Sequence, residues 1–417
     1  MNIDRRQFLT STAAGLVTAS LAERLSAAAP KTPPVIPGWG SYKPPPLQPF
    51  LTPANEFTDV SRGKPNPKTL QGEALVQARL TPETWRLEIT ADHEPKDYSP
   101  DVASITKPVT LDLPALMELG RKHGVKYIKA MQCLNIPTPL GQGLWEGVPL
   151  REVLRLTGTM LNVRRIYYWG FHNNDPKQMF RSSLSYSQVM ETPPGELPVF
   201  IAYRLNGEPL PQLRGGPVRM IVPWAHGFKS IKWLQRIVLT NDYKANDTYA
   251  DEKNNDPESH LKTAAYVYEM AKEYAKGQPI TIQGRVISGW SGLQHVEYWL
   301  RRMANSTDDL AENDPAWASA KWVKCDLAQP PADWSTIFPE GISSKDVLGF
   351  DPETGQPRTW PLRYSMVAWS AKVPELPPGE YEVRARSVDL NGFAQPEPRP
   401  MVKTGRNFLL VRRFKVA

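Results

Sequence analysis

The stretch AYRLNGEPLPQLRGGPVRMIVPWAHGFKSIKWLQRI, residues 202–237, is the most informative part of the chain about its fold. It begins with the end of an apolar strand that turns at Asn206-Gly207, a dipeptide typical of tight β-turns. Two further strand-like runs, residues 216–223 and 231–240, flank a loop that contains glycine, lysine and serine. The pattern predicts sheet strands joined by a basic loop.

Upstream of this stretch, short strands and short helices follow one another without a regular order. Strand patterns occupy residues 85–90, 125–133 and 164–171, and helix patterns that end at a glycine occupy residues 111–124 and 148–158. A doubly wound sheet would show a steadier alternation of strand and helix. The order therefore predicts an α+β fold.

Downstream, the pattern changes twice. Residues 246–262 are polar, and we expect a helix after them that ends at Gly277, with one face formed by Ala264, Val267, Tyr268 and Ala271. From Pro279 onward, strand-like runs are separated by Pro, Gly and Asn turns, which predicts a β-sandwich. The predicted organisation is one domain over residues 30–277, including a polar linker and helix near 246–277, and a second domain over residues 278–417.

The first 29 residues indicate a twin-arginine signal peptide. Arg5 and Arg6 precede Phe8-Leu9, a modest apolar stretch and a small-residue end. This export route carries proteins that are already folded, often with a cofactor inserted. We therefore expect a periplasmic protein in an oxidising compartment.

Composition excludes several classes of protein. With 41% hydrophobic and 22% charged residues, the chain is not expected to be disordered. After the N-terminus it has no apolar run long enough for a transmembrane helix. The net charge of +7 is mild and no nucleic-acid motif is present, so we expect no nucleic-acid partner.

The chain has only two cysteines, which leaves three interpretations of Cys133 in KAMQCLNIP, residues 129–137. It can fill a core as a small apolar residue. It can pair with Cys325 in a disulfide, which an exported protein permits. It can also be a thiolate ligand to a metal. The residues by themselves leave these alternatives open, and Cys325 is expected to be a half-buried thiol.

Three blocks of sequence resemble the sulfite oxidase family of molybdopterin-dependent oxidoreductases. The run QCLNIPTPLGQGLWEGVPLREVL, residues 132–154, is similar to the family's cofactor segment, where a strand ends in Gln-Cys-x-x-Asn. Residues 202–237 resemble a second family block, and NDYK, residues 241–244, resembles a third. The resemblance spans roughly residues 50–417. It implies an α+β fold with a sulfite-oxidase-type molybdopterin-binding domain, followed by an immunoglobulin-like β-sandwich that forms a homodimer.

The resemblance also implies a molybdenum–molybdopterin cofactor, with the Cys133 thiolate as the protein's ligand to the metal. A molybdenum centre that transfers oxygen needs soft sulfur ligands, and the cofactor performs the redox chemistry. The residues implied to hold the pterin and its phosphate are His172, Arg214, Arg219, Lys229, Ser230 and Lys232. The residues implied to orient and polarise the substrate oxygen are Arg62 and Tyr243.

The sequence departs from the family pattern on the substrate side. Ile136 and Pro137 follow the cysteine segment where the family has arginines, and the sandwich offers Gln294 and His295 where the family has another arginine. Few cations are left to bind a doubly charged oxyanion. We take sulfite oxidation as the default activity, with reduction of an S-oxide or N-oxide as the alternative, and a non-catalytic binding protein as a further one.

The implied partners are a small-molecule substrate, a second copy of the chain and an external electron-transfer protein such as a c-type cytochrome. The last is expected because the sequence has no Cys-x-x-Cys-His haem motif.

Overall fold

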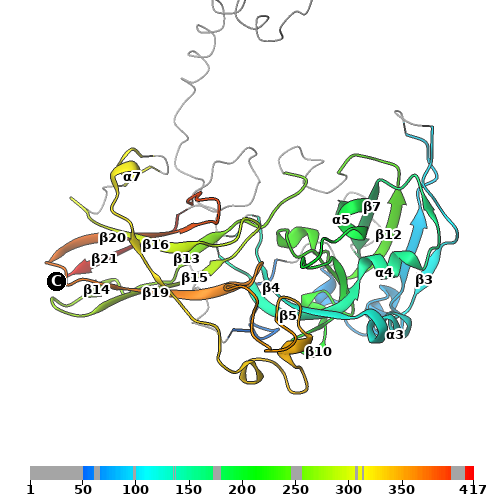
Figure 1. Cartoon of the computed structure of the whole chain (residues 1–417), viewed down its shortest axis with the longest axis horizontal. Coiled ribbons are helices and arrows are strands. Elements are labelled where there is room, and N and C mark those ends of the chain that lie inside the picture. The colour runs from blue at the N-terminus through cyan, green and yellow to red at the C-terminus, as the bar shows by residue number, and fades with distance from the viewer. Residues whose placement is uncertain are drawn as a thin grey trace, which may run out of the picture. The chain divides into compact units, whose positions relative to one another are not determined.

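The computed structural model describes residues 50–60, 66–96, 100–134, 136, 138–171, 180–245, 256–305, 309–311, 314–395 and 409–417. All of these residues belong to one compact unit, Pro45–Ala417 (Figure 1). The predicted signal peptide, residues 1–29, lies outside the described residues.

Two sheets form the first half of this unit. The first has the strand order β3 (Val109–Leu111), β1 (Leu87–Ala91), β12 (Leu234–Thr240), β7 (Arg165–Gly170) and β8 (Arg181–Ser185). The second has the order β10 (Glu208–Pro209), β9 (Phe200–Leu205), β5 (Gly141–Pro149) and β4 (Val125–Met131), with β11 (Arg219–Ile221) also paired to β9. A small third sheet joins β2 (Ser104–Ile105) and β6 (Met160–Leu161).

Short helices connect these strands. They are α2 (Glu73–Gln77), α3 (Leu113–His123), α4 (Leu150–Arg155) and α5 (Tyr186–Met190), with the 3-10 turns η1 (Pro67–Thr69), η2 (Gln212–Arg214) and η3 (Gly227–Lys229). The helix predicted over residues 111–124 is confirmed as α3. Its first turn is capped by the Asp112 carboxylate, which accepts a hydrogen bond from the Ala115 amide at 2.9 Å, and it ends before Gly124.

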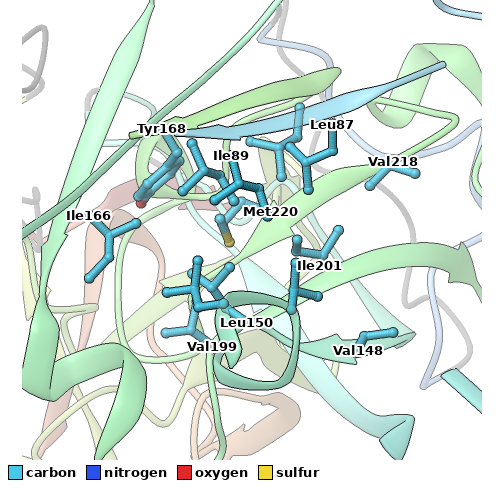
Figure 2. Packing of buried hydrophobic residues seen from close by; sticks show 14 of the residues in the cluster. Leu87, Ile89, Val148, Leu150, Ile166, Tyr168, Val199, Ile201, Val218 and Met220 are labelled. Atoms are coloured by element: carbon cyan, nitrogen blue, oxygen red, sulfur yellow. The ribbon is translucent and has the colours of Figure 1, made fainter. Parts of the chain in front are cut away.

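The core of this half lies where the two sheets and the helices meet. Figure 2 shows Leu87 and Ile89 of β1 close to Tyr168 of β7 and Met220 of β11, with Leu150 of α4 below them. These side chains are fully excluded from solvent. Burying the apolar faces of both sheets on one core fixes where the loops at their ends can go.

The second half is a β-sandwich, as the turn spacing predicted. One sheet has the order β13 (Ala264–Val267), β15 (Ile280–Ile287), β19 (Met366–Val373) and β18 (Asp326–Leu327). The other has β14 (Glu273–Tyr274), β21 (Val411–Val416), β20 (Gly379–Val388), β16 (His295–Arg302) and β17 (Val323–Lys324). Side chains of both sheets form one apolar core. That this sandwich is immunoglobulin-like stays a prediction.

Three short helical elements lie between sandwich strands in chain order. They are α7 (Ala316–Ser319), η4 (Trp334–Thr336) and η5 (Ser344–Asp346). None of the described helices is long and apolar enough to cross a bilayer.

The helix expected near residues 246–277 is wrong for the part that the structure describes. Ala264 and Val267 belong to strand β13, which pairs antiparallel with β15, and β14 follows at Glu273. Apolar residues spaced three and four apart fit a helix face. All four residues of β13 are buried, however, and a strand paired inside the sandwich buries more of their apolar surface than one helix face would. The sandwich strands thus begin before the predicted boundary at residue 277, and residues 246–255 lie outside the described residues.

Candidate functional site

A pocket with about 800 Å³ of empty space, counting its open mouth, lies where the end of β4, strand β11 and the loop 227–233 before β12 approach the segment 57–60. Its wall combines Cys133 with cations and apolar side chains. The lining residues are Phe57, Thr58, Val60, Met131, Cys133, Leu140, Phe180, Arg214, Arg219, Gly227, Phe228, Ser230, Ile231, Lys232 and Trp233. Five of the sequence-predicted site residues therefore share one wall: Cys133, Arg214, Arg219, Ser230 and Lys232.

Cys133 is half-buried and lies two residues after the end of strand β4. The side-chain amide of Gln132 donates to the carbonyl oxygens of Cys133, at 3.1 Å, and Ile136, at 2.6 Å. The carbonyl of Gln132 accepts from the Gly227 amide at 2.7 Å, which ties the cysteine to the basic loop. The structure does not join Cys133 to Cys325, so the disulfide interpretation is wrong.

Arg219 lines the pocket and is almost fully buried. Its guanidinium donates to the carbonyls of Arg214, at 2.8 Å, and Ser230, at 2.6 Å. It also lies 5.1 Å from the centre of the Trp145 ring. Burial, together with the nearby Arg214, lowers the pKa of Arg219 to about 9. The protein thus holds this charge in place at an electrostatic cost.

Arg214 is the second buried cation, with only 3% of its surface exposed. It ends the turn η2 and lies 5.8 Å from the Phe57 ring. The next residue, Gly215, has a φ of +100°, and a Cβ there would approach the side chain of Lys232 to 2.7 Å, so glycine is required. Burial lowers the pKa of Arg214, an effect that Asp59 partly offsets.

Lys232 is the third cation of the wall. Its ammonium donates to Asp59 Oδ1 at 3.1 Å and to the Leu213 carbonyl at 3.2 Å. Burial, and then the charge of Arg219, lower its pKa to about 7. Lys232 therefore changes its charge near neutral pH, which an exposed lysine does not do.

Ser230 and Lys229 belong to the same loop but have different surroundings. Ser230 lines the pocket, and its hydroxyl accepts a hydrogen bond from the Val222 amide at 3.1 Å. Lys229 is fully buried behind the loop, where its ammonium donates to the Ser183 carbonyl at 3.0 Å. Lys229 does not line the pocket, so its contacts support the loop and not a ligand there.

The remaining predicted residues are not brought to the pocket by the described structure. Arg62 and His172 lie outside the described residues. Tyr243 is 59% exposed and follows the far end of β12, whereas the pocket residue Trp233 precedes its near end. A seven-residue strand spans about 23 Å, so this geometry does not support a catalytic role for Tyr243.

Two buried titratable residues outside the set of predicted site residues, Lys129 and His226, lie next to the start of the basic loop. Lys129 donates to the carbonyls of Ala130 and Ala225, both at 3.1 Å, and burial lowers its pKa to about 7. Burial lowers the pKa of His226 to about 4, and its Nδ1 lies 3.2 Å from the Ser259 carbonyl oxygen. The sequence signal for Lys129 is its position inside a strand with apolar residues on both faces.

The residues of the pocket fit an anionic cofactor that binds a metal beside Cys133. The Nε atoms of Arg214 and Arg219 are buried and have no hydrogen-bond partner among the described residues. Buried donors without partners are costly, and a phosphate group would supply acceptors and negative charge together. A thiolate is the soft ligand that molybdenum in such a cofactor requires.

The two buried lysines predict how the stability of the cofactor-free protein depends on pH. An unfolded lysine keeps its proton up to about pH 10.5, whereas Lys129 and Lys232 have a pKa of about 7 in the folded protein. Between these values the unfolded chain binds more protons, so the free energy of unfolding rises with pH. The slope is at most about 1.4 kcal/mol per pH unit for each lysine.

Urea titrations of the cofactor-free protein at pH 7 and pH 8.5 measure this slope. Lys232→Met should remove the share contributed by Lys232 and leave that of Lys129. An equal free energy of unfolding at both pH values would show that these lysines keep their ordinary pKa in the fold.

Comparison with known proteins agrees with this geometry. Residues 74–248 match the family described as "Oxidoreductase molybdopterin binding domain". Mitochondrial sulfite oxidase of Rattus norvegicus is 25% identical over 195 residues, which are 46% of this chain and 35% of the relative. The chain thus spans about a third of the length of the curated sulfite oxidases that it matches.

A second relative is covered more fully. The protein-methionine-sulfoxide reductase catalytic subunit MsrP of Ralstonia nicotianae is 28% identical over 253 residues, 56% of this chain and 67% of the relative. Among solved structures, the sulfane dehydrogenase SoxCD of Paracoccus pantotrophus matches with a TM-score of 0.54 at 16% identity, over 81% of this chain and 79% of that chain. The last match concerns the fold alone.

Proposed function

Because the chain belongs to the sulfite oxidase family of molybdopterin-dependent oxidoreductases, and is thus an enzyme with a molybdopterin cofactor, we propose that it catalyses two-electron oxygen-atom transfer at a sulfur centre. The observation that supports this most is the shared wall of one pocket: a half-buried thiol together with three cations. The thiol suits the metal and the cations suit the phosphate.

Each residue of the wall has a distinct task in this proposal. When bound, the cofactor supplies a metal centre that exchanges two electrons and an oxygen atom with the substrate. Cys133 would hold the metal, while Arg214, Arg219 and Lys232 would bind the phosphate. The backbone bonds of Arg219 to Arg214 and Ser230 fix its guanidinium in advance, so little ordering remains when the phosphate binds.

Sulfite is the default substrate in this proposal, since sulfite oxidases are among the relatives. A specific observation favours reduction of an S-oxide as the second candidate. The described cations of the pocket all come from one segment, residues 214–232, while much of the remaining wall is apolar: Phe57, Val60, Met131, Leu140, Phe180 and Phe228. An apolar wall suits a neutral sulfoxide better than a dianion.

Substrate assays of natively purified protein separate the two candidates. Sulfite oxidation is measured with an artificial electron acceptor, and reduction of methionine sulfoxide or dimethyl sulfoxide with a reduced viologen dye. If sulfite is the substrate, its kcat/KM should exceed that of any sulfoxide at least about a hundredfold, since a site built for one charge state rejects the other. Turnover of sulfoxide without sulfite turnover would select the second candidate, and turnover of neither would contradict both.

We further propose that the chain is exported to the periplasm through its twin-arginine segment, forms a homodimer through the sandwich and exchanges electrons with a c-type cytochrome. The export proposal rests on Arg5 and Arg6 and on the small residues before residue 30. The alternative of a non-catalytic binding protein is set aside, because the matched family is one of oxidoreductases.

A further inference from the structure

A carboxylate, that of Asp59, lies against the cations of the pocket. Its Oδ1 accepts a hydrogen bond from Lys232 Nζ at 3.1 Å, and its Oδ2 is paired with Lys68. The residues on either side, Thr58 and Val60, line the pocket. An anion that binds Lys232 must therefore compete with a carboxylate that is already there.

The position of Asp59 is fixed by its neighbours. The amide of Thr58 donates to the Leu140 carbonyl at 2.8 Å, and Leu140 lines the same pocket as Cys133. The Phe57 ring packs beside Gly141, where a Cβ would come within 2.4 Å of it. These contacts hold segment 57–60 against the pocket and keep Asp59 beside Lys232.

We propose that Asp59 is a positioning residue of the anion site. It pairs with Lys232 in the cofactor-free protein and releases Lys232 to the phosphate of the cofactor when the cofactor binds. This inference rests on the proposed phosphate-binding role of the pocket. Lys68 lowers the free-energy cost of this exchange, because Asp59 keeps a cationic partner after Lys232 has turned to the incoming anion. Small inorganic anions lack the other contacts of the cofactor and are held off.

Asp59 acts on anion binding in two opposite ways. Its negative charge competes with the anion for Lys232, which weakens binding at any pH. The same charge raises the pKa of Lys232 against the lowering caused by burial, Arg219 and Arg214. Removing the carboxylate therefore strengthens anion binding while Lys232 is protonated, and it also makes Lys232 lose its proton at lower pH.

The test is sulfate binding to the full-length, cofactor-free chain, measured by calorimetry at pH 6 and pH 8.5. Sulfate stays a dianion at both pH values, so only the protein titrates. Asp59→Asn should bind sulfate at least about tenfold more tightly than the wild type at pH 6. The advantage should be clearly smaller at pH 8.5, where Lys232 is largely neutral in both proteins and only the repulsion between Asp59 and the anion is removed. Lys68→Met should change the sulfate affinity in the opposite direction. It should weaken binding at pH 6, because Asp59 then has fewer cationic partners and binds Lys232 more strongly.

The matched control is Asp92→Asn. Asp92 is also part of an ion pair, with Lys96 at 2.6 Å, and its side chain is 16% exposed against 21% for Asp59. It accepts a hydrogen bond from Thr240, at the far end of β12 from the pocket, so sulfate affinity should stay unchanged. Equal sulfate affinity of wild type and Asp59→Asn at pH 6, or an advantage that persists undiminished at pH 8.5, would overturn the inference.

Molybdenum content of the natively purified wild type is read separately. A full complement of metal with no effect of Asp59 on sulfate binding would remove this inference and leave the proposed function standing. Absence of the metal from the wild type would remove the proposed function itself.

Discussion

Replacing Cys133 by serine is expected to abolish molybdenum retention and turnover. Serine keeps the size of the side chain but does not offer a soft thiolate to the metal. Loss of a group that merely orients a metal ligand typically lowers metal affinity or activity 10–100-fold. Loss of the ligand itself should therefore lower metal affinity and turnover by more than about a hundredfold. Molybdenum per chain, measured by mass spectrometry on natively purified protein, is the readout.

The second cysteine provides the control for this change. Burial raises the pKa of the Cys325 thiol to about 12, and the residue packs against the sandwich core, away from the pocket lining. A thiol with so high a pKa is a poor metal ligand. Cys325→Ser should keep the full metal content, and equal loss in both variants would indicate unfolding in place of a lost ligand.

Replacing Arg219 by leucine is expected to have the second largest effect, a loss of cofactor of about 10- to 100-fold. A charge-assisted hydrogen bond contributes about 1.5–3 kcal/mol, and each 1.4 kcal/mol is a factor of ten in affinity. The variant also leaves the carbonyls of Arg214 and Ser230 without this donor, while it removes a buried charge. The lost hydrogen bonds destabilise the fold, whereas removal of the buried charge stabilises it. The unfolding free energy of the cofactor-free chain should therefore change by less than about 2 kcal/mol.

Arg285→Leu is the matched control for Arg219→Leu. Arg285 is also buried, at 7% exposure, but it lies in the sandwich strand β15 beside Met366 Sδ and the Tyr268 ring. Pterin content, measured by fluorescence of the oxidised extract, should fall in Arg219→Leu and stay unchanged in Arg285→Leu. Normal pterin content in Arg219→Leu would contradict the phosphate-binding role of this wall.

Much of the fold was predictable because local patterns agree with the tertiary structure. The Pro and Gly positions around residues 111–124 predicted α3, and the buried run before Cys133 predicted β4. The failure at residues 264–267 has a physical cause. A strand of four buried residues is determined by its partner β15, which no local pattern reveals.

The candidate site was predictable where a residue lies in a recognisable block, and less so elsewhere. Cys133, Arg214, Arg219, Ser230 and Lys232 do line one pocket, whereas Lys229 turns to the Ser183 carbonyl and Tyr243 is exposed. A sequence block does not say which of two adjacent cations faces the ligand. Asp59 was missed because its importance comes from Lys232, a residue far away in the chain.

X-ray absorption at the molybdenum edge of the natively purified chain tests the central claim most directly. The expected result is molybdenum close to one equivalent per chain, with sulfur neighbours that include the Cys133 thiolate. In Cys133→Ser protein, whatever metal remains should show fewer sulfur neighbours. A full complement of molybdenum with an unchanged spectrum in Cys133→Ser would contradict the assignment of this pocket.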